Sequence, residues 1–140
     1  MAFGDVAKKL SEPTNPSVLN LTVGDGGAIA KGALCYLSGD NTASTTAAGS
    51  IGLPFAGIAA AEKVASDGLT TLGFQTCGVY DIVAGNTIAL GQLVMISGAN
   101  SVCPLGAGVG SYAISGGLVV GKALEAADSG ETIAVAVGYY

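Results

Sequence analysis

The sequence predicts an all-β fold: a small β-barrel or sandwich of the β-tulip kind, built from two similar β-meander halves behind an extended N-terminal arm. Two observations predict it. Glycine accounts for 23 of 140 residues, more than twice its usual share of roughly 7%, and it separates short apolar runs. The segment 28–42, AIAKGALCYLSGDNT, returns without gaps at 87–101 as TIALGQLVMISGANS, with seven of fifteen positions identical. Because glycine disfavours helix interiors and supplies turns, each copy is expected to form turn, strand and turn.

The domain organisation follows from composition and from the repeat. Residues 1–17 hold two of the five lysines and two of the four prolines, and proline favours extended or turn backbone in the residue before it. This segment is expected to be an extended N-terminal arm. Residues 18–140 are expected to form a single β-domain with an internal duplication, divided at about 18–83 and 84–140.

The first half begins with an alternating segment, Val18–Val23, which predicts a half-buried strand that ends in a glycine turn. The first copy of the repeat follows, and its apolar segment Leu34–Ser38 predicts a second strand. Ala43–Ser50 consists of small residues and is expected to be an exposed, mobile loop.

Later segments extend the correspondence to about 50 residues per half. Residues 59–65 and 122–127 are helix-prone but too short to stand alone, so both are expected to be strand endings that pass into Asp/Ser-Gly turns. Residues 69–83 form the longest β-like run, in which Gly73 and Gly78 are expected to introduce bends. Residues 118–126 and 131–137 are expected to close the chain as a hairpin-like pair.

Charge argues against nucleic acid as a partner, and the length of the apolar runs argues against a membrane. The chain has five lysines, no arginine and ten acidic residues, for a net charge of −5. A phosphate backbone is bound by clustered basic side chains, so nucleic acid is not expected as a partner. No apolar run reaches the 18 residues that a spanning helix needs, so no membrane partner is expected either.

The three cysteines, Cys35, Cys77 and Cys103, are widely spaced, and each lies among apolar residues. Free, buried thiols are the simpler interpretation. One disulfide with a leftover thiol is the alternative, which spacing alone does not decide. Without histidine, three scattered cysteines do not predict a metal site.

Catalytic machinery is missing from the residue inventory. With no histidine there is no imidazole base for a serine or cysteine nucleophile, and with no arginine there is no bidentate anion clamp. The glycine-rich segment 106–111 lacks the third glycine and the helix of a dinucleotide fingerprint. Most acids lie in or beside turns, where solvated carboxylates are common, and the isolated Lys31, Lys63 and Lys122 are expected at solvated rims. The sequence therefore predicts no enzyme and no cofactor.

The C-terminal half carries a family resemblance. Residues 85–94 read GNTIALGQLV, residues 121–126 read GKALEA, and residues 129–135 read SGETIAV. This sequence pattern resembles that of the small capsid decoration, or cement, proteins of tailed bacteriophages. In that family a glycine recurs before short apolar strands, and the chain ends with a G-x-A-L-E-A…G-E-T-x-x-V pattern. The likeness covers about residues 18–137 and is strongest over 85–137.

The resemblance implies a structural virion protein on the outer surface of the phage capsid, made in the host cytoplasm. Such proteins bind the assembled head as β-domains, usually homotrimers, bridge neighbouring subunits of the major capsid protein and stabilise the shell. It also implies an N-terminal arm that lies along the capsid. The residues expected to contact the capsid are those of the arm: Phe3, Val6, Lys8, Lys9, Leu10, Pro13 and Pro16. Deleting residues 1–16 is expected to abolish attachment and to leave the domain folded.

Two alternatives stay open at this point. One is another β-rich assembly component, such as a tail, fibre-base or surface-layer protein. The other is an enzyme or ligand-binding barrel that uses carboxylates, which would need two acids close together in a closed pocket.

Overall fold

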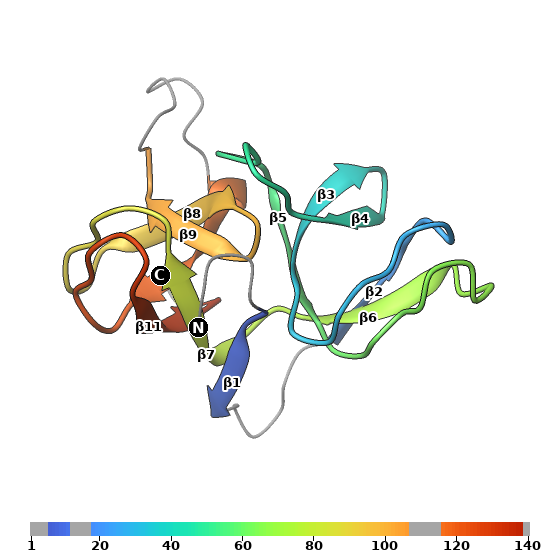
Figure 1. Cartoon of the computed structure of the whole chain (residues 1–140), viewed down its shortest axis with the longest axis horizontal. Helices are drawn as coiled ribbons and strands as arrows, with labels where there is room; N and C mark the ends of the chain where they lie inside the picture. The colour runs from blue at the N-terminus through green and yellow to red at the C-terminus, as the bar shows by residue number, and fades with distance from the viewer. Residues whose placement is uncertain (1–5, 12–17, 107–115, 139–140) are drawn as a thin grey trace.

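The computed structural model describes residues 6–11, 18–106 and 116–138. The regular elements of this part of the chain are β-strands and one short 3₁₀ helix, η2 (Gly116–Leu118) (Figure 1). The predicted all-β class and barrel architecture are confirmed. The strands are β1 (Lys8–Ser11), β2 (Val18–Thr22), β3 (Leu34–Gly39), β4 (Thr42–Thr45), β5 (Phe55–Ala59), β6 (Thr71–Gln75), β7 (Gly78–Ala84), β8 (Leu93–Gly98), β9 (Ser101–Pro104), β10 (Val119–Ala123) and β11 (Thr132–Val137).

Five strands close the first barrel, which we call the N-terminal barrel. Its order is β2-β4-β3-β5-β6, and β6 returns to pair with β2. All its pairings are antiparallel except β2 with β4, which meet in parallel at Thr22 and Thr42. Inward-facing Leu21, Cys35 and Phe74 belong to one buried apolar cluster, which holds this barrel together by excluding water from its interior.

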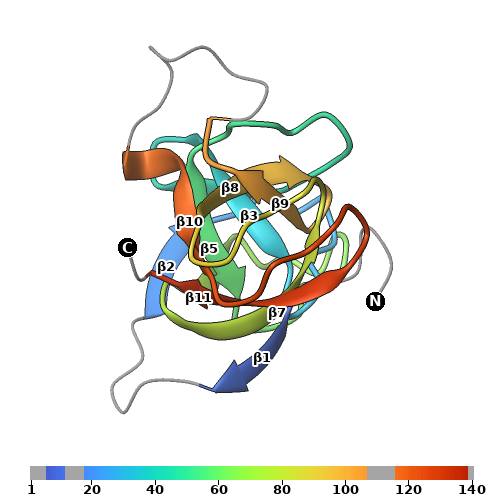
Figure 2. The same ribbon diagram turned by 90° about the vertical axis from the view of Figure 1, so that its left-hand side faces the viewer.

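The remaining strands repeat this arrangement and form what we call the C-terminal barrel. Its order is β7-β11-β10-β8-β9, and a parallel pairing of β7 with β9 brings the sheet round on itself. β1 adds a sixth strand to β7. Figure 1 shows the two barrels side by side, and Figure 2 shows β1 lying against β7.

The repeated segments occupy the same places in the two barrels. Gly39 opposes Thr42 across a bulge in one, and Gly98 opposes Ser101 across a bulge in the other. The turns between these strands also match, since Asn41 (φ 51°) and Asn100 (φ 49°) both have left-handed backbone, which asparagine tolerates better than most residues. Each half therefore closes its own barrel, instead of two meanders sharing one.

Two predicted segments differ in the structure. The long β-like run 69–83 is two strands, because β6 ends at Gln75 and β7 begins at Gly78. By strand pairing the two halves divide at residues 76–77, so the predicted division at 83 and 84 falls at the end of β7. The predicted loop Ala43–Ser50 begins inside β4, where Ala43 is buried and pairs with Leu37 of β3. The pairing with another strand decides this conformation, and the composition of the segment does not reveal it.

The other segments agree with the sequence. Residues 59–65 and 122–127 begin at the ends of β5 and β10 and continue into turns, and β10 and β11 pair as the predicted hairpin. Cys35, Cys77 and Cys103 are free thiols; two are buried and Cys77 is half-buried. Burial raises the pKa of Cys35 to about 12, which favours its neutral thiol.

Candidate interaction surface

Residues 6 and 7, which we call the N-terminal segment, lie in the seam between the two barrels. Ala7 is buried with the large apolar cluster that includes the C-terminal barrel core, whereas the half-buried Val6 packs against the core of the N-terminal barrel. The backbone N–H of Ala7 donates to the carbonyl oxygen of Gly32 over 2.8 Å. This segment therefore contacts both barrels.

Glycine at position 32 is required by this contact. Its φ of +87° lies in the left-handed region, which costs other residues roughly 1–2 kcal/mol. A Cβ at this position would also overlap the carbonyl oxygen of Ala7. The first glycine turn of the repeat is thus the place where the N-terminal segment reaches the barrel.

β1 then continues along the edge of β7. The pairing is antiparallel, with Lys8 opposite Asp81 and Lys9 opposite Tyr80, and the register shifts before Ser11 pairs with Val79. The backbone groups of this edge are used within the chain, and an exposed strand edge otherwise invites pairing with another chain.

The residues predicted to contact the capsid are only partly described. Val6 is half-buried in the seam, and Lys8, Lys9 and Leu10 lie in β1. Phe3, Pro13 and Pro16 lie outside the described residues. The prediction that deletion of residues 1–16 leaves the domain folded is not supported, because the deletion removes buried Ala7 and all of β1. Capsid contact by these residues stays a prediction.

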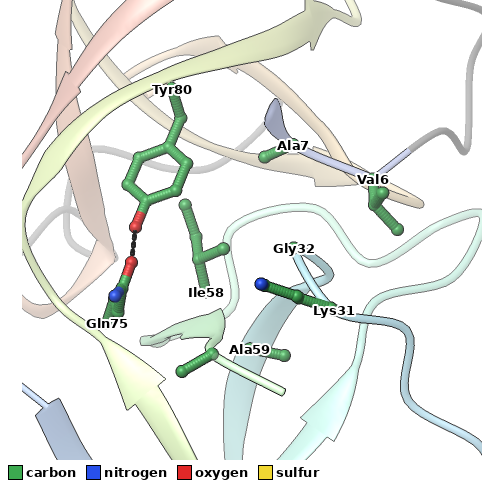
Figure 3. A pocket seen from close by; sticks show the side chains of 9 residues that line it. Val6, Ala7, Lys31, Gly32, Ile58, Ala59, Gln75 and Tyr80 are labelled. Atoms are coloured by element: carbon green, nitrogen blue, oxygen red, sulfur yellow. Dashed lines mark hydrogen bonds between the residues drawn. The ribbon is translucent and has the colours of Figure 1, made fainter. Parts of the chain in front are cut away.

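A cavity of about 390 Å³ opens beside this segment. Figure 3 shows its lining: apolar Val6, Ala7, Ile58 and Ala59, with Gln75, Tyr80 and Lys31 as the polar members. The Tyr80 hydroxyl donates to the Gln75 side-chain oxygen, as a buried tyrosine usually requires a partner. None of the lining residues is an acid, so this cavity lacks the carboxylate pair that the enzyme alternative needs.

The most charged buried site is elsewhere, at Lys63. Its side chain is fully buried, and its Nζ donates to Asp67 Oδ1 (2.9 Å), to Asp25 Oδ1 (3.3 Å) and to the carbonyl oxygens of Asp25 and Val64. The prediction that Lys63 is a solvated rim residue was wrong. Asp25 lies 38 positions away, and a pairing over that distance leaves no local sequence signal.

Ion pairing sets the protonation of this site. Burial lowers the pKa of Lys63, but the hydrogen bonds and charges of Asp67 and Asp25 outweigh it and hold the pKa above its ordinary value. The backbone N–H of Leu69 and then Lys63 lower the pKa of Asp67. Lys63 Nζ donates to oxygens of Asp25, Val64 and Asp67, so this side chain joins two neighbouring turns.

Further kinds of site are absent from the described residues. Within residues 6–11, 18–106 and 116–138, no three His, Cys, Asp or Glu side chains are grouped closely enough to hold a metal ion. Over the same residues, no helix has the length and hydropathy to cross a membrane.

Comparison with solved structures identifies a related fold. The chain is similar to the crystal structure of the N base of head fiber gp8.5 of bacteriophage phi29, with a TM-score of 0.51 and 17% sequence identity, over 88% of this chain and 94% of that one. At this identity the likeness concerns the fold. No curated protein matches the chain significantly.

Comparison with protein families identifies the chain more specifically. Residues 14–139 match the family described as phage cement protein. The match includes both barrels and agrees with the resemblance carried by the C-terminal half. The chain belongs to the phage cement protein family.

Proposed function

We propose that this protein binds the outside of the assembled phage capsid as a homotrimer, bridges neighbouring subunits of the major capsid protein and stabilises the head. The observation that carries the proposal is the family match over residues 14–139. It makes the protein a structural component of a phage particle, and the capsid is the partner that such a component serves.

The residue inventory supports a structural role over catalysis. The chain has no histidine or arginine, and the cavity beside Ala7 is lined without acids. The buried Lys63 bridges Asp25 and Asp67 and so holds two turns together. In this proposal the protein acts by binding alone and has no turnover.

A second candidate is the base of a head fibre. The similarity in fold to the N base of the phi29 head fiber, which extends over 94% of that chain, favours it. A fibre base also binds a phage head, so the two candidates share the capsid as partner. They differ in whether a fibre is mounted on the bound protein, which electron microscopy of native particles distinguishes.

Co-sedimentation with capsids tests the proposal. Purified protein is mixed with expanded empty shells and, separately, with unassembled major capsid protein. We expect it to sediment with the shells and not to bind the free subunits, because a bridging site exists only where subunits adjoin. Equal binding to both, or to neither, would contradict the proposal.

A pair of truncations tests the arm within the same assay. Deleting residues 1–5 removes Phe3 and leaves Ala7 and β1 in place; we expect weaker shell binding with an unchanged unfolding temperature. Deleting residues 1–11 is expected to lower the unfolding temperature as well, because the seam between the barrels is opened. If the first deletion bound shells as the full chain does, the five residues would not be a capsid contact.

A further inference from the structure

The cavity in the seam between the two barrels has the size of a small-molecule site. Its volume is about 390 Å³, within the range of roughly 300–1,000 Å³ that is common for such sites. Its walls come from three parts of the chain: the N-terminal segment, the N-terminal barrel at residues 31–32, 58–60 and 75, and β7 of the C-terminal barrel at Tyr80. A molecule bound there would contact both barrels at once.

Small side chains leave this space open. Four of the lining residues, Ala7, Gly32, Ala59 and Ala60, have no side chain larger than a methyl group. A bulkier residue is compatible with the fold at one of these positions, because the C-terminal barrel has Leu124 where the N-terminal barrel has Ala60. The equivalence is fixed by backbone hydrogen bonds, in which Gly32 N–H donates to Ala59 O as Gly91 N–H donates to Ala123 O.

Most of the lining is apolar and suits a hydrocarbon group. Ile58 is 1% exposed and Ala59 is buried beside it. A trapped water molecule needs two to four polar partners, which alanine and isoleucine side chains do not supply. An apolar ligand that displaces water from this wall therefore gains the free energy of burial.

The polar pair of the lining is already bonded and forms a rigid wall. The Tyr80 hydroxyl donates to the Gln75 side-chain oxygen (Figure 3), and Tyr80 is buried. This bond fixes the plane of the ring, whose face is apolar. The pair joins β6 of one barrel to β7 of the other.

Lys31 gives the cavity its charge. It is the charged member of the described lining, and it is exposed, so its ammonium can meet a ligand at the opening. Among the described residues both ion pairs belong to Lys63, so no carboxylate of these residues neutralises Lys31. Figure 3 shows the amine of Lys31 directed toward Ile58, above the apolar wall.

This combination of cation and apolar wall is specific to the seam. In the aligned segments 28–42 and 87–101, Leu90 stands where Lys31 stands in the first copy. The corresponding place in the C-terminal barrel thus lacks both the cation and the small residue at position 60. The two differences act together, since one supplies a charge and the other supplies room for an apolar chain.

We propose that the seam cavity binds a small amphiphile that carries a terminal carboxylate on an apolar chain, the chemistry of a medium-chain fatty carboxylate. The chain lies against Ile58, Ala59 and Ala7, and the carboxylate accepts a charge-assisted hydrogen bond from Lys31 Nζ. Because the ligand contacts both barrels and the N-terminal segment, it stabilises their packing. This binding does not depend on attachment to a capsid.

Decanoate and decanol are the probes that test the site. Isothermal titration calorimetry of the full chain, with both probes below the concentration at which they self-associate, should show one decanoate bound per chain. Amide shifts in a heteronuclear NMR spectrum should centre on Gly32 and Ala59, and the unfolding temperature should rise with decanoate concentration.

Three variants separate the parts of the site. Lys31→Met should weaken decanoate binding by about ten-fold, since a charge-assisted hydrogen bond is lost, and should leave decanol binding unchanged. Ala60→Leu, which introduces the residue of the other barrel, should weaken binding of both probes. Lys122→Met removes a lysine outside the lining and should change neither, which controls for net charge. Thermal unfolding verifies that each variant is folded.

Three results would overturn the proposal. They are the absence of saturable decanoate binding to the natural chain, decanoate binding that persists unchanged in Ala60→Leu, and equal losses in Lys31→Met and Lys122→Met. Shell binding is measured in a separate assay without either probe, so the outcome for this site leaves the proposed function to its own test.

Discussion

At the scale of single residues, the fully buried Lys63 is a clear difference between the two barrels. Ile29 pairs with Lys63 in one barrel, and Ile88 with Ala127 at the matching place in the other. A buried ammonium needs a compensating charge and hydrogen bonds, and Asp67 and Asp25 supply them. The N-terminal barrel thus joins two turns by ion pairing, whereas the C-terminal barrel has the apolar Ala127 at the position of Lys63.

Asp67 is expected to stabilise the fold at neutral pH and to lose that contribution in acid. Its pKa is lowered in the folded state, so as pH falls through about 4 the unfolded chain binds the proton first. The free energy of unfolding should fall as the pH drops through the folded-state pKa of Asp67. In Asp67→Asn this loss should be smaller, and stability at neutral pH should already be reduced.

Denaturant unfolding at a series of pH values from neutral to strongly acidic measures both effects. Asp40→Asn, which removes an exposed turn carboxylate, is the control for the change in net charge, and its acid dependence should follow that of the natural chain. Parallel curves for Asp67→Asn and the natural chain would show that the ion pair does not govern acid stability.

At the scale of elements, β1 is the strand whose position changes the interpretation of the N-terminus. Prolines and lysines predicted an extended arm, and residues 8–11 are extended, but they pair with β7 of their own chain. Backbone groups at a strand edge pair equally well with a segment of the same chain or of another. Composition therefore predicts the extended conformation and not the partner.

Gly32→Ala should destabilise the protein more than Gly49→Ala, because it alone disturbs this segment. Both glycines have a φ of +87°, but a Cβ at Gly49 would meet no atom within 4 Å. The control substitution should cost roughly 1–2 kcal/mol for the left-handed backbone. Gly32→Ala should cost about 1 kcal/mol more, since displacement of Ala7 breaks its hydrogen bond to residue 32.

Unfolding in denaturant measures the difference, and hydrogen exchange at the N–H of Ala7 locates it. Exchange should be faster in Gly32→Ala and unchanged in Gly49→Ala. Equal losses of stability in the two variants would mean that the N-terminal segment contributes nothing to the seam.

At the scale of the whole molecule, membership of the phage cement protein family indicates a structural protein of a phage particle. In the proposed function, the protein bridges neighbouring subunits of the capsid. Bridging makes weak contacts multivalent, so that a shell with many bound copies gains more than one contact would suggest.

Decorated shells should therefore rupture at a higher temperature than bare shells. Differential scanning calorimetry of both preparations, with shells mixed with the residue 1–5 deletion as the control, measures the shift. The control should melt with the bare shells if the arm is needed for attachment. Identical rupture temperatures for decorated and bare shells would contradict stabilisation.

The sequence by itself determined the all-β class and the turn-strand-turn repeat, because these depend on glycine placement and on apolar periodicity within a few residues. It also carried the resemblance to the family that the match over residues 14–139 shows. Seven shared positions aligned segments that do occupy matching strands. The sequence also predicted that all three cysteines are buried, since each lies among apolar neighbours; this is right for Cys35 and Cys103 and wrong for Cys77, which is half-buried.

Only the tertiary structure decided which distant groups meet. In the tertiary structure each half closes as a separate barrel, Asp25 forms an ion pair with Lys63, and β1 pairs with β7. The same segments could have paired otherwise, because the hydrogen bonds of alternative strand pairings are alike and the choice depends on side chains brought together from far along the chain. Local sequence predicts strands and turns, and long-range packing selects their neighbours.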